Sequence, residues 1–231
     1  MNTSNAIVLL SGGIDSALNL ALASKNKMAR LALYFDYGQR ARISEMKASQ
    51  SLAEYYGVLW KRVELPWLTS LGTSALTQKE ISLPQFTIAE LDINEKTDAS
   101  MKQVWVPNRN AVFLSIAASF AESFAADTIL AGFNAEEAST FPDNSVPFME
   151  AISKAFSFST LNKVKVDSFT KSWDKEEIFR QALELELPLQ FVWSCYEGGD
   201  FRCGKCESCK RSERGLKVHG QENIWNSTQH I

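Results

Sequence analysis

The stretch Ala6-Ile7-Val8-Leu9-Leu10-Ser11-Gly12-Gly13-Ile14-Asp15-Ser16 decides the fold of this chain of 231 residues. Its apolar first half predicts a buried strand, and the Ala- and Leu-rich residues after Ser16 predict a helix. Between them, Gly12 and Gly13 can adopt backbone angles closed to other residues, so their N–H groups can approach an anion closely. The positive end of the helix points at the same place. The stretch therefore predicts a phosphate site, with the hydroxyls of Ser11 and Ser16 as further donors.

An ordinary glycine turn in which Asp15 caps the helix is the alternative interpretation of this stretch. A Walker A loop does not fit, because that loop requires the pattern G-x-x-x-x-G-K-[ST]. Residues 199–205 nearly meet that pattern, but Cys206 stands where Ser or Thr is needed and no apolar strand precedes them. The complete hexapeptide 11–16 after an apolar strand favours the phosphate site over the plain turn.

The composition is that of a globular protein with one domain and room for a small appendage. A formal charge of −3 gives no general attraction to nucleic acid or to anionic membranes. No apolar run approaches the roughly 18 residues of a membrane span, and the first ten residues show no secretory signal. We therefore expect a cytoplasmic protein, and the charge argues against nucleic acid as its partner. Two histidines leave little material for Ser-His-Asp hydrolysis.

Strands alternate with helices along the chain, which predicts an α/β fold with a doubly wound, mostly parallel sheet. After the first strand and helix, we expect strands over 30–35, 59–65, 127–132 and 164–166, and helices over 41–56, 111–126, 148–158 and 175–187. Residues 66–103 lose this pattern, and a connection of that length predicts a lid or an insertion. We divide the chain into a domain over 1–190 and a small C-terminal element with a tail over 191–231.

The loops after successive strands of such a sheet meet in one crevice. Arg40, Arg109 and Lys175 each follow a strand at the start of a helix, so we expect them to face the phosphate site. Solvated surface charges are the alternative interpretation of all three. Pro107 is expected in the first turn of its helix, where a missing N–H costs nothing, which places Arg109 at the helix mouth.

All four cysteines, Cys195, Cys203, Cys206 and Cys209, lie within one short segment with the spacing C-x7-C-x2-C-x2-C. In a reducing compartment this cluster predicts a metal site rather than disulfides. Four thiolates suit a tetrahedral, structural Zn²⁺ with no open position. An iron–sulfur cluster is the alternative, but no further Cys-Pro follows Cys209, and Cys195 lies upstream, which favours zinc.

Four stretches together resemble the 7-cyano-7-deazaguanine synthase family, which belongs to the PP-loop ATP pyrophosphatases. They are 11–16, the sequence Asp36-Tyr37-Gly38-Gln39-Arg40, residues 106–110, and the segment 193–199 followed by 203–209. The resemblance extends from residue 6 to about 216. It implies a PP-loop ATP-binding domain over 1–190, a four-cysteine zinc element in 191–231, and a homodimer.

The resemblance implies an ATP-dependent C–N ligase of queuosine and archaeosine precursor biosynthesis, with small molecules as its substrates. In this family the carboxylate of 7-carboxy-7-deazaguanine is adenylated, ammonia displaces AMP, and the amide is activated again and dehydrated to the nitrile. Mg²⁺ and fixed positive groups stabilise the charge that develops on the phosphates. On this resemblance the catalytic residues are Asp15, which helps to hold Mg²⁺, Arg109 and Lys175. ATP is bound by Leu10, Ser11, Gly12, Gly13, Ile14, Asp15, Ser16 and Arg40, and the four cysteines match the family's zinc ligands.

The chain departs from the family pattern in residues 132–145, which follow a predicted strand. There Glu137 replaces an Asp, Phe141 lacks a hydroxyl, and a Cys-Arg pair of the family is missing; Ala41 also replaces a frequent His. We expect this loop to bind the substrate through Asn134, Glu137, Ser139, Phe141 and Asp143. Three alternatives remain: a paralogous PP-loop enzyme that adenylates a related acid, one that modifies tRNA, and a non-catalytic nucleotide-binding module.

Overall fold

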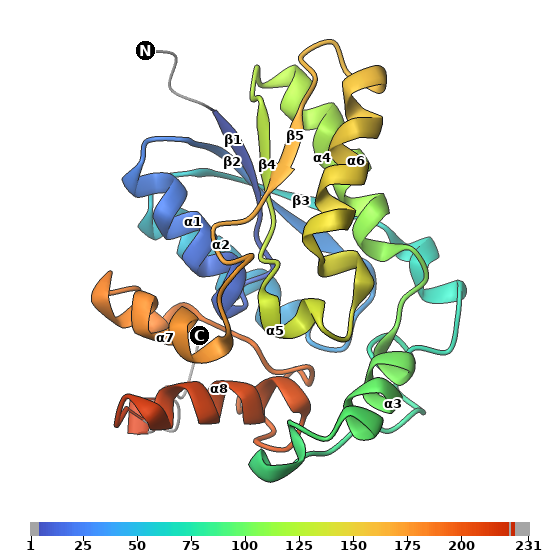
Figure 1. The fold of residues 1–231 in the computed structure, drawn as a ribbon, viewed down its shortest axis with the longest axis vertical. Coiled ribbons are helices and arrows are strands. Elements are labelled where there is room, and N and C mark those ends of the chain that lie inside the picture. The colour runs from blue at the N-terminus through green and yellow to red at the C-terminus, as the bar shows by residue number, and fades with distance from the viewer. Residues whose placement is uncertain (1–4, 222, 225–231) are drawn as a thin grey trace.

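A computed structural model describes residues 5–221, 223 and 224 (Figure 1). Five parallel strands form one sheet in the order β3-β2-β1-β4-β5. Their bounds are β1 Ala6–Leu9, β2 Ala29–Asp36, β3 Leu59–Glu64, β4 Thr128–Leu130 and β5 Lys165–Asp167. The predicted α/β class with a parallel, doubly wound sheet is confirmed. The strand order reverses between β1 and β4, which is where such sheets bind ligands.

The central strand β1 is buried on both faces because its residues are apolar throughout. Ala6, Ile7 and Val8 are fully buried, as the strands of a sheet covered by helices on both sides must be. The edge strand β3 is different, since most of its residues are exposed and it carries Lys61 and Arg62. Charged side chains on an edge strand oppose pairing with another sheet.

Helices cover both faces of the sheet. On one face α1 (Ile14–Lys25), α2 (Arg42–Tyr55) and α7 (Lys175–Glu184) form one apolar core with β1 (Figure 1). On the other face α4 (Arg109–Ser123) and α6 (Val146–Ser159) form the second core. These elements agree with the predicted ranges to within a few residues.

Two helix ends differ from the prediction. α4 begins only at Arg109, and its N-cap is Asn108, which has a left-handed backbone with φ 54°. Pro107 therefore precedes the helix instead of lying in its first turn, and its predicted position is wrong. Asn tolerates this left-handed conformation better than most residues. α7 ends at Glu184 rather than at 187, because Glu186 takes a positive φ of 51° that a helix cannot continue through.

Residues 66–103 form an ordered insertion with its own helix, α3 (Asn94–Val104), and two short 3-10 turns, Pro66–Ser70 and Ile88–Glu90. It packs against the segment that carries the cysteines. The Phe86 N–H donates to the Lys205 carbonyl oxygen at 2.8 Å, and Ser100 Oγ donates to Glu207 Oε2 at 2.5 Å. The apolar periodicity of the chain did not predict α3, because that helix is predominantly polar.

The C-terminal segment contacts the loop after β1, where the Trp193 N–H donates to the Gly12 carbonyl oxygen at 2.8 Å. It continues into α8 (Glu207–Val218), which packs against α7. Arg211 fixes α8, because its guanidinium pairs with Glu207 and also with Glu136 of the short helix α5 (Ala135–Ala138). Two further 3-10 turns cover Pro142–Asn144 and Leu189–Phe191. The last part of the predicted tail, residues 225–231, lies outside the described residues. Over the described part of the chain, none of the helices has both the length and the apolar character needed to span a membrane.

Candidate active site

The loop between β1 and α1 requires glycine at position 12. Gly12 has a φ of +87°, a backbone conformation that favours glycine. A Cβ there would lie 2.7 Å from Ala48 Cβ and 2.9 Å from the Glu45 carbonyl oxygen, so α2 could not pack against the loop. The alternative in which Asp15 caps the helix is wrong, because α1 begins at Ile14 with Gly13 as its N-cap and no side-chain cap.

Serine hydroxyls surround the N-terminus of α1. Ser11 Oγ accepts the Gly13 N–H at 3.3 Å and lies 3.1 Å from Ser16 Oγ. Ser16 Oγ donates to the Gly13 carbonyl oxygen at 2.9 Å. The Ile14 N–H donates to Ser194 Oγ at 3.1 Å, although 180 residues separate the two. Hydroxyl oxygens thus accept from helix amides that have no partner within the helix, which is the position that an anion takes at a helix N-terminus.

A cavity of about 260 Å³ lies beside this loop. That volume is near the lower end of small-molecule sites. Its walls come from the ends of β1 and β2, from α4, and from the loops after β4 and before α8. The predicted site residues that line it are Leu10, Ser11, Gly13, Asp15, Ser16, Arg109, Glu137 and Phe141.

Lys175 pairs with two carboxylates that line the cavity, those of Asp15 and Glu137. Its Nζ donates to both carboxylate oxygens of Asp15 at 2.8 Å and to Glu137 Oε1 at 3.2 Å, and Lys175 is 4% exposed. Burial alone would lower the pKa of Lys175, but the two carboxylates outweigh burial and raise it above its ordinary value. Lys175 therefore stays charged. It does not line the cavity itself.

The neighbouring Asn134 also holds the carboxylate of Asp15. Its Nδ2 donates to Asp15 Oδ1 at 3.1 Å, while its Oδ1 accepts the Glu137 N–H at 2.8 Å as the N-cap of α5. Gly132 makes this approach of the two loops possible, because a Cβ there would meet the Ser16 nitrogen at 2.7 Å. Asn134 therefore does not line the cavity but holds Asp15 and Glu137, which do.

Arg109 is held by an aromatic side chain from the loop after β2. Its Nη1 donates to Tyr37 Oη at 3.0 Å, and its guanidinium lies 5.5 Å from the centre of the Tyr37 ring. Burial raises the pKa of Tyr37, so its hydroxyl stays protonated. Among the described residues, no carboxylate lies within salt-bridge distance of Arg109. A charged guanidinium in the cavity wall without a carboxylate partner suits an anionic ligand.

Glu45 brings a further carboxylate to the cavity from the first turn of α2. Its Oε2 accepts Gln39 Nε2 at 2.7 Å, and Gln39 is fixed in turn by Tyr34 Oη and the Phe35 carbonyl oxygen. Burial raises the pKa of Glu45 from 4.5 to about 7, against the lowering effects of Gln39 and Arg109.

This raised pKa makes stability depend on pH. Between pH 4.5 and about 7 the folded protein keeps the Glu45 proton that the unfolded chain has lost. Stability contributed by this group is therefore lost as the pH rises through that window, by up to about 3 kcal/mol. Glu45→Gln keeps the carbonyl acceptor and should remove this loss, so the variant should be more stable than the wild type at pH 8 but not at pH 4.5. Urea unfolding at both pH values measures it, and an equal shift at the two pH values would contradict it.

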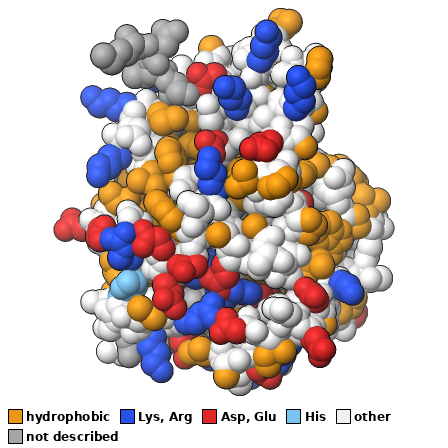
Figure 2. Space-filling view, in the orientation of Figure 1, with side chains coloured by type: hydrophobic (Ala, Val, Ile, Leu, Met, Phe, Trp, Pro, Cys, Tyr) orange, Lys and Arg blue, Asp and Glu red, His pale blue; other side chains and the backbone are white. Residues whose placement is uncertain are grey.

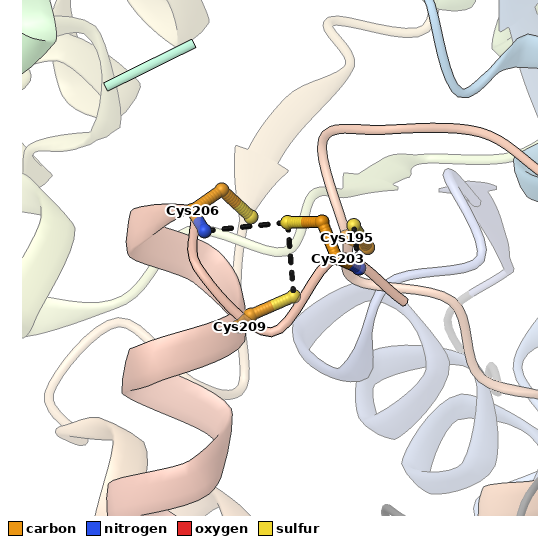
Figure 3. A group of neighbouring side chains, drawn as sticks. All are labelled: Cys195, Cys203, Cys206 and Cys209. Atoms are coloured by element: carbon orange, nitrogen blue, oxygen red, sulfur yellow. Dashed lines mark hydrogen bonds between the residues drawn. The ribbon is translucent and has the colours of Figure 1, made fainter. Parts of the chain in front are cut away.

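The four cysteines converge between the segment 195–203 and the start of α8 (Figure 3). Their sulfur atoms all lie within 4.8 Å of one another, and Cys203 Sγ is 3.9 Å from Cys209 Sγ. Four sulfurs at Zn–S distances of about 2.3 Å lie nearly 3.8 Å apart, so this donor set fits a tetrahedral metal ion. The site lies next to the cavity but offers it no cysteine, since none of the four lines the cavity.

Comparison with known proteins identifies the family. The model of the family described as queuosine biosynthesis protein QueC matches residues 5–220. The chain belongs to the QueC family. It is 46% identical over 218 residues to the 7-cyano-7-deazaguanine synthase of Methanosarcina mazei, covering 93% of this chain and 94% of that protein. It is 47% identical over 216 residues to that of Desulforamulus reducens, covering 94% and 95%.

Solved structures share the fold at low identity. A U34-tRNA thiolase NcsA from Methanococcus maripaludis, with its [4Fe-4S] cluster, has a TM-score of 0.53 at 18% identity over 99% of this chain and 72% of that one. A 4-thiouridine synthetase in complex with RNA and ATP has a TM-score of 0.52 at 17% identity over 97% and 52%. At these identities the likeness shows the fold alone.

Arg40, Ser139 and Asp143 were also predicted for the site of this QueC family member, but they do not line the cavity. The guanidinium of Arg40 donates to the carbonyl oxygens of Gln78 and Ile81 and pairs with Glu197 at 3.3 Å, so Arg40 fastens the insertion rather than facing the phosphate loop. The exposed Ser139 donates to the Glu136 carbonyl oxygen at 2.6 Å. The charge of Arg109 acts on Asp143, where it opposes the rise in pKa that burial causes, and the next residue, Asn144, lines the cavity in its place.

Several cavity residues received no role from the sequence. Tyr37 and Gln39 stand in a stretch that carries the family resemblance, and so do Ser194 and Tyr196. Their positions in those stretches were a usable signal. Ser208 lies in the resembling stretch 203–209 and had the same signal. Glu45 had none, because a Glu on a helix is common and only the tertiary fold brings it to the cavity.

Proposed function

We propose that this protein is a 7-cyano-7-deazaguanine synthase, an ATP-dependent ligase that makes a queuosine precursor. The family match over residues 5–220, at 46% identity to a synthase across nearly its whole length, carries the proposal. The geometry supports it, because one small cavity combines a glycine loop at a helix N-terminus with the guanidinium of Arg109 and the carboxylates of Asp15 and Glu137.

Adenylation gives the carboxylate of the substrate a good leaving group, AMP. Without activation, the carbon of a carboxylate is a poor electrophile. In the first step a carboxylate oxygen attacks the α-phosphorus of ATP while the bond to the β-phosphate breaks. The N–H groups after Gly12 and the hydroxyls of Ser11 and Ser16 are placed to hold the departing pyrophosphate. Ammonia then attacks the acyl carbon and AMP leaves. The amide oxygen is adenylated in the same way before the second AMP leaves and the nitrile forms.

Asp15 and Glu137 are the residues that fit Mg²⁺, because this ion prefers carboxylate oxygens together with phosphate oxygens. Bound there, Mg²⁺ would neutralise charge on the phosphates. Lys175 keeps the two carboxylates close together, with Nζ 2.8 Å and 3.2 Å from their oxygens. Leu10 and Ile14 are further proposed ATP contacts through their place in the loop.

Zinc is the metal that we propose for the cysteine site. All four cysteines come from one short segment, with Cys203, Cys206 and Cys209 in the two short steps that bend around a single ion. Four cysteines without disulfides also suit a reducing cytoplasm, where we place the protein. Metal analysis with an absorption spectrum separates zinc, which is colourless, from an iron–sulfur cluster.

The substrate is a small molecule rather than a nucleic acid. On the face seen in Figure 2, Lys and Arg side chains are interspersed with Asp and Glu, without the broad basic surface that nucleic acid binding requires. A second copy of the chain is the partner that we propose. α4 is mostly apolar, and Val112, Ile116 and Phe120 on it are only half-buried. Light scattering should give a mass twice that of the chain.

The loop 132–145 leaves one further candidate, a related carboxylated deazapurine, because Phe141 lines the cavity without the family's hydroxyl. The test incubates the protein with ATP, Mg²⁺, ammonium and each acid. We expect AMP, pyrophosphate and the nitrile with 7-carboxy-7-deazaguanine. Faster turnover with another acid favours the paralogue, and release of ADP, or none with any acid, contradicts the proposal.

Arg109→Gln should reduce kcat/KM roughly 100-fold, because a fixed positive charge near the reacting phosphates is lost. Tyr37→Phe removes only the hydroxyl that positions this guanidinium, 3.0 Å away, and should have a smaller effect. Steady-state kinetics of pyrophosphate release measure both. Equal activity of Arg109→Gln and the wild type would show that Arg109 has no role in the mechanism.

A further inference from the structure

Ser194 reaches the phosphate loop from the opposite end of the chain. Its hydroxyl oxygen lies 3.1 Å from the Ile14 nitrogen, and a Cβ on Gly13 would lie 3.7 Å from it. Ser194 also lines the cavity. It therefore stands at the first amide of α1, on the side of the loop that faces the ligand space.

The surrounding contacts fix Ser194 in this place. The preceding Trp193 N–H donates to the Gly12 carbonyl oxygen at 2.8 Å, and the Ser194 carbonyl oxygen accepts from Ser208 Oγ at 2.6 Å. Trp193 is 4% exposed, and its indole Nε1 donates to the Cys195 carbonyl oxygen at 3.1 Å. The segment before the first cysteine thus clamps the loop at Gly12 and at Ile14.

The Ser194 hydroxyl has an unused proton. It accepts the Ile14 N–H, and within the described part of the chain it donates to no acceptor. The other hydroxyls at the loop have an acceptor within reach. Ser16 donates to the Gly13 carbonyl oxygen, Ser208 donates to the Ser194 carbonyl oxygen, and Ser11 Oγ lies 3.1 Å from Ser16 Oγ. A hydroxyl beside a helix N-terminus with its proton available can donate to the oxygen of a bound anion.

We propose that Ser194 is a further phosphate-binding residue of the loop, which donates its hydroxyl proton to the pyrophosphate part of the nucleotide. This proposal rests on the proposed function, because it takes the loop to hold pyrophosphate. When the anion accepts the Ile14 N–H in place of Ser194 Oγ, a small rotation of the side chain turns the same hydroxyl from acceptor to donor. The cysteine element then contributes directly to nucleotide binding.

Calorimetric titration with pyrophosphate and Mg²⁺ tests the proposal on the intact protein. Ser194→Ala should bind pyrophosphate roughly tenfold or more weakly, because a hydrogen bond to a charged group is lost. Ser194→Thr keeps the hydroxyl and should restore most of the affinity. Ser212→Ala is the matched control, since its hydroxyl also lies in the cysteine element and donates to the Ser208 carbonyl oxygen, outside the cavity.

Unchanged or tighter binding by Ser194→Ala would overturn the proposal, because a hydroxyl that only competes with the anion for the Ile14 N–H should weaken binding when present. Wild-type turnover with the acid is measured alongside, so a failure of the proposed reaction is distinguished from a failure of Ser194. If Ser194→Ala does not fold, a structure of the wild type with pyrophosphate decides instead. Ser194 Oγ more than about 4 Å from every phosphate oxygen there would also overturn the proposal.

Discussion

Gly12→Ala should abolish most of the activity and destabilise the protein. The new methyl group would meet Ala48 Cβ at 2.7 Å and the Glu45 carbonyl oxygen at 2.9 Å, and backbone atoms cannot yield cheaply. The positive φ adds roughly 1–2 kcal/mol of strain, and crowding adds about 1–3 kcal/mol. Because the loop must move away from α2, its amides lose their alignment on the phosphates. We expect kcat/KM to fall at least about 100-fold.

Gly57→Ala is the control for this prediction. Gly57 also has a positive φ, +64°, but a Cβ there would meet nothing within 4 Å. An alanine at position 57 would therefore have the backbone strain without a steric clash. Position 57 also lies beyond the C-terminal end of α2, whereas the phosphate loop packs near its start. We expect a small loss of stability and normal kinetics from Gly57→Ala. If Gly12→Ala had the same kinetics as this control, the close fit of the loop against α2 would be irrelevant to catalysis.

Cys206→Ser should lose the metal ion that we propose for the cysteine site and unfold the C-terminal element. Cys206 is 1% exposed and is the N-cap of α8, so its thiolate ties the start of that helix to the other three sulfurs. Removing one of four thiolates from a structural site typically costs several kcal/mol, because the binding free energy of the metal contributes to folding. Activity should fall too, since the same segment clamps the phosphate loop through Trp193 and Ser194.

Lys205→Ala is the control for the cysteine variant, because Lys205 is the exposed neighbour of Cys206 and its backbone oxygen, which the substitution keeps, accepts the bond from the insertion. Metal content and the midpoint of thermal unfolding are measured for both variants. Full occupancy with unchanged stability in Cys206→Ser would show that the cluster does not hold a structural ion.

The sequence predicted the parallel sheet because its strands are short apolar runs between helices, as β1 shows with three fully buried residues. It predicted the phosphate loop from the two glycines, and Gly12 indeed has a backbone conformation that favours glycine. It missed α3, which is polar, and it placed Pro107 inside a helix that begins two residues later.

Side-chain directions were harder to predict than positions in the chain. Arg40 follows a strand as Arg109 does, yet its guanidinium turns to the carbonyl oxygens of the insertion. The sequence around the two arginines does not distinguish them, because the direction of the Arg40 side chain is set by its contacts with the insertion. Ser194 lies in a stretch that carries the family resemblance, but its bond to Ile14 spans 180 residues and could not be predicted from that stretch.

The loop is proposed to hold the pyrophosphate released when the substrate's carboxylate is adenylated, and the whole mechanism depends on this step. The most direct measurement uses an acid whose carboxylate carries ¹⁸O and follows the label by mass spectrometry. Because adenylation transfers carboxylate oxygen to phosphorus, we predict ¹⁸O in the AMP and none in the pyrophosphate. Label in inorganic phosphate, with ADP as the nucleotide product, would show activation by phosphorylation and would contradict adenylation.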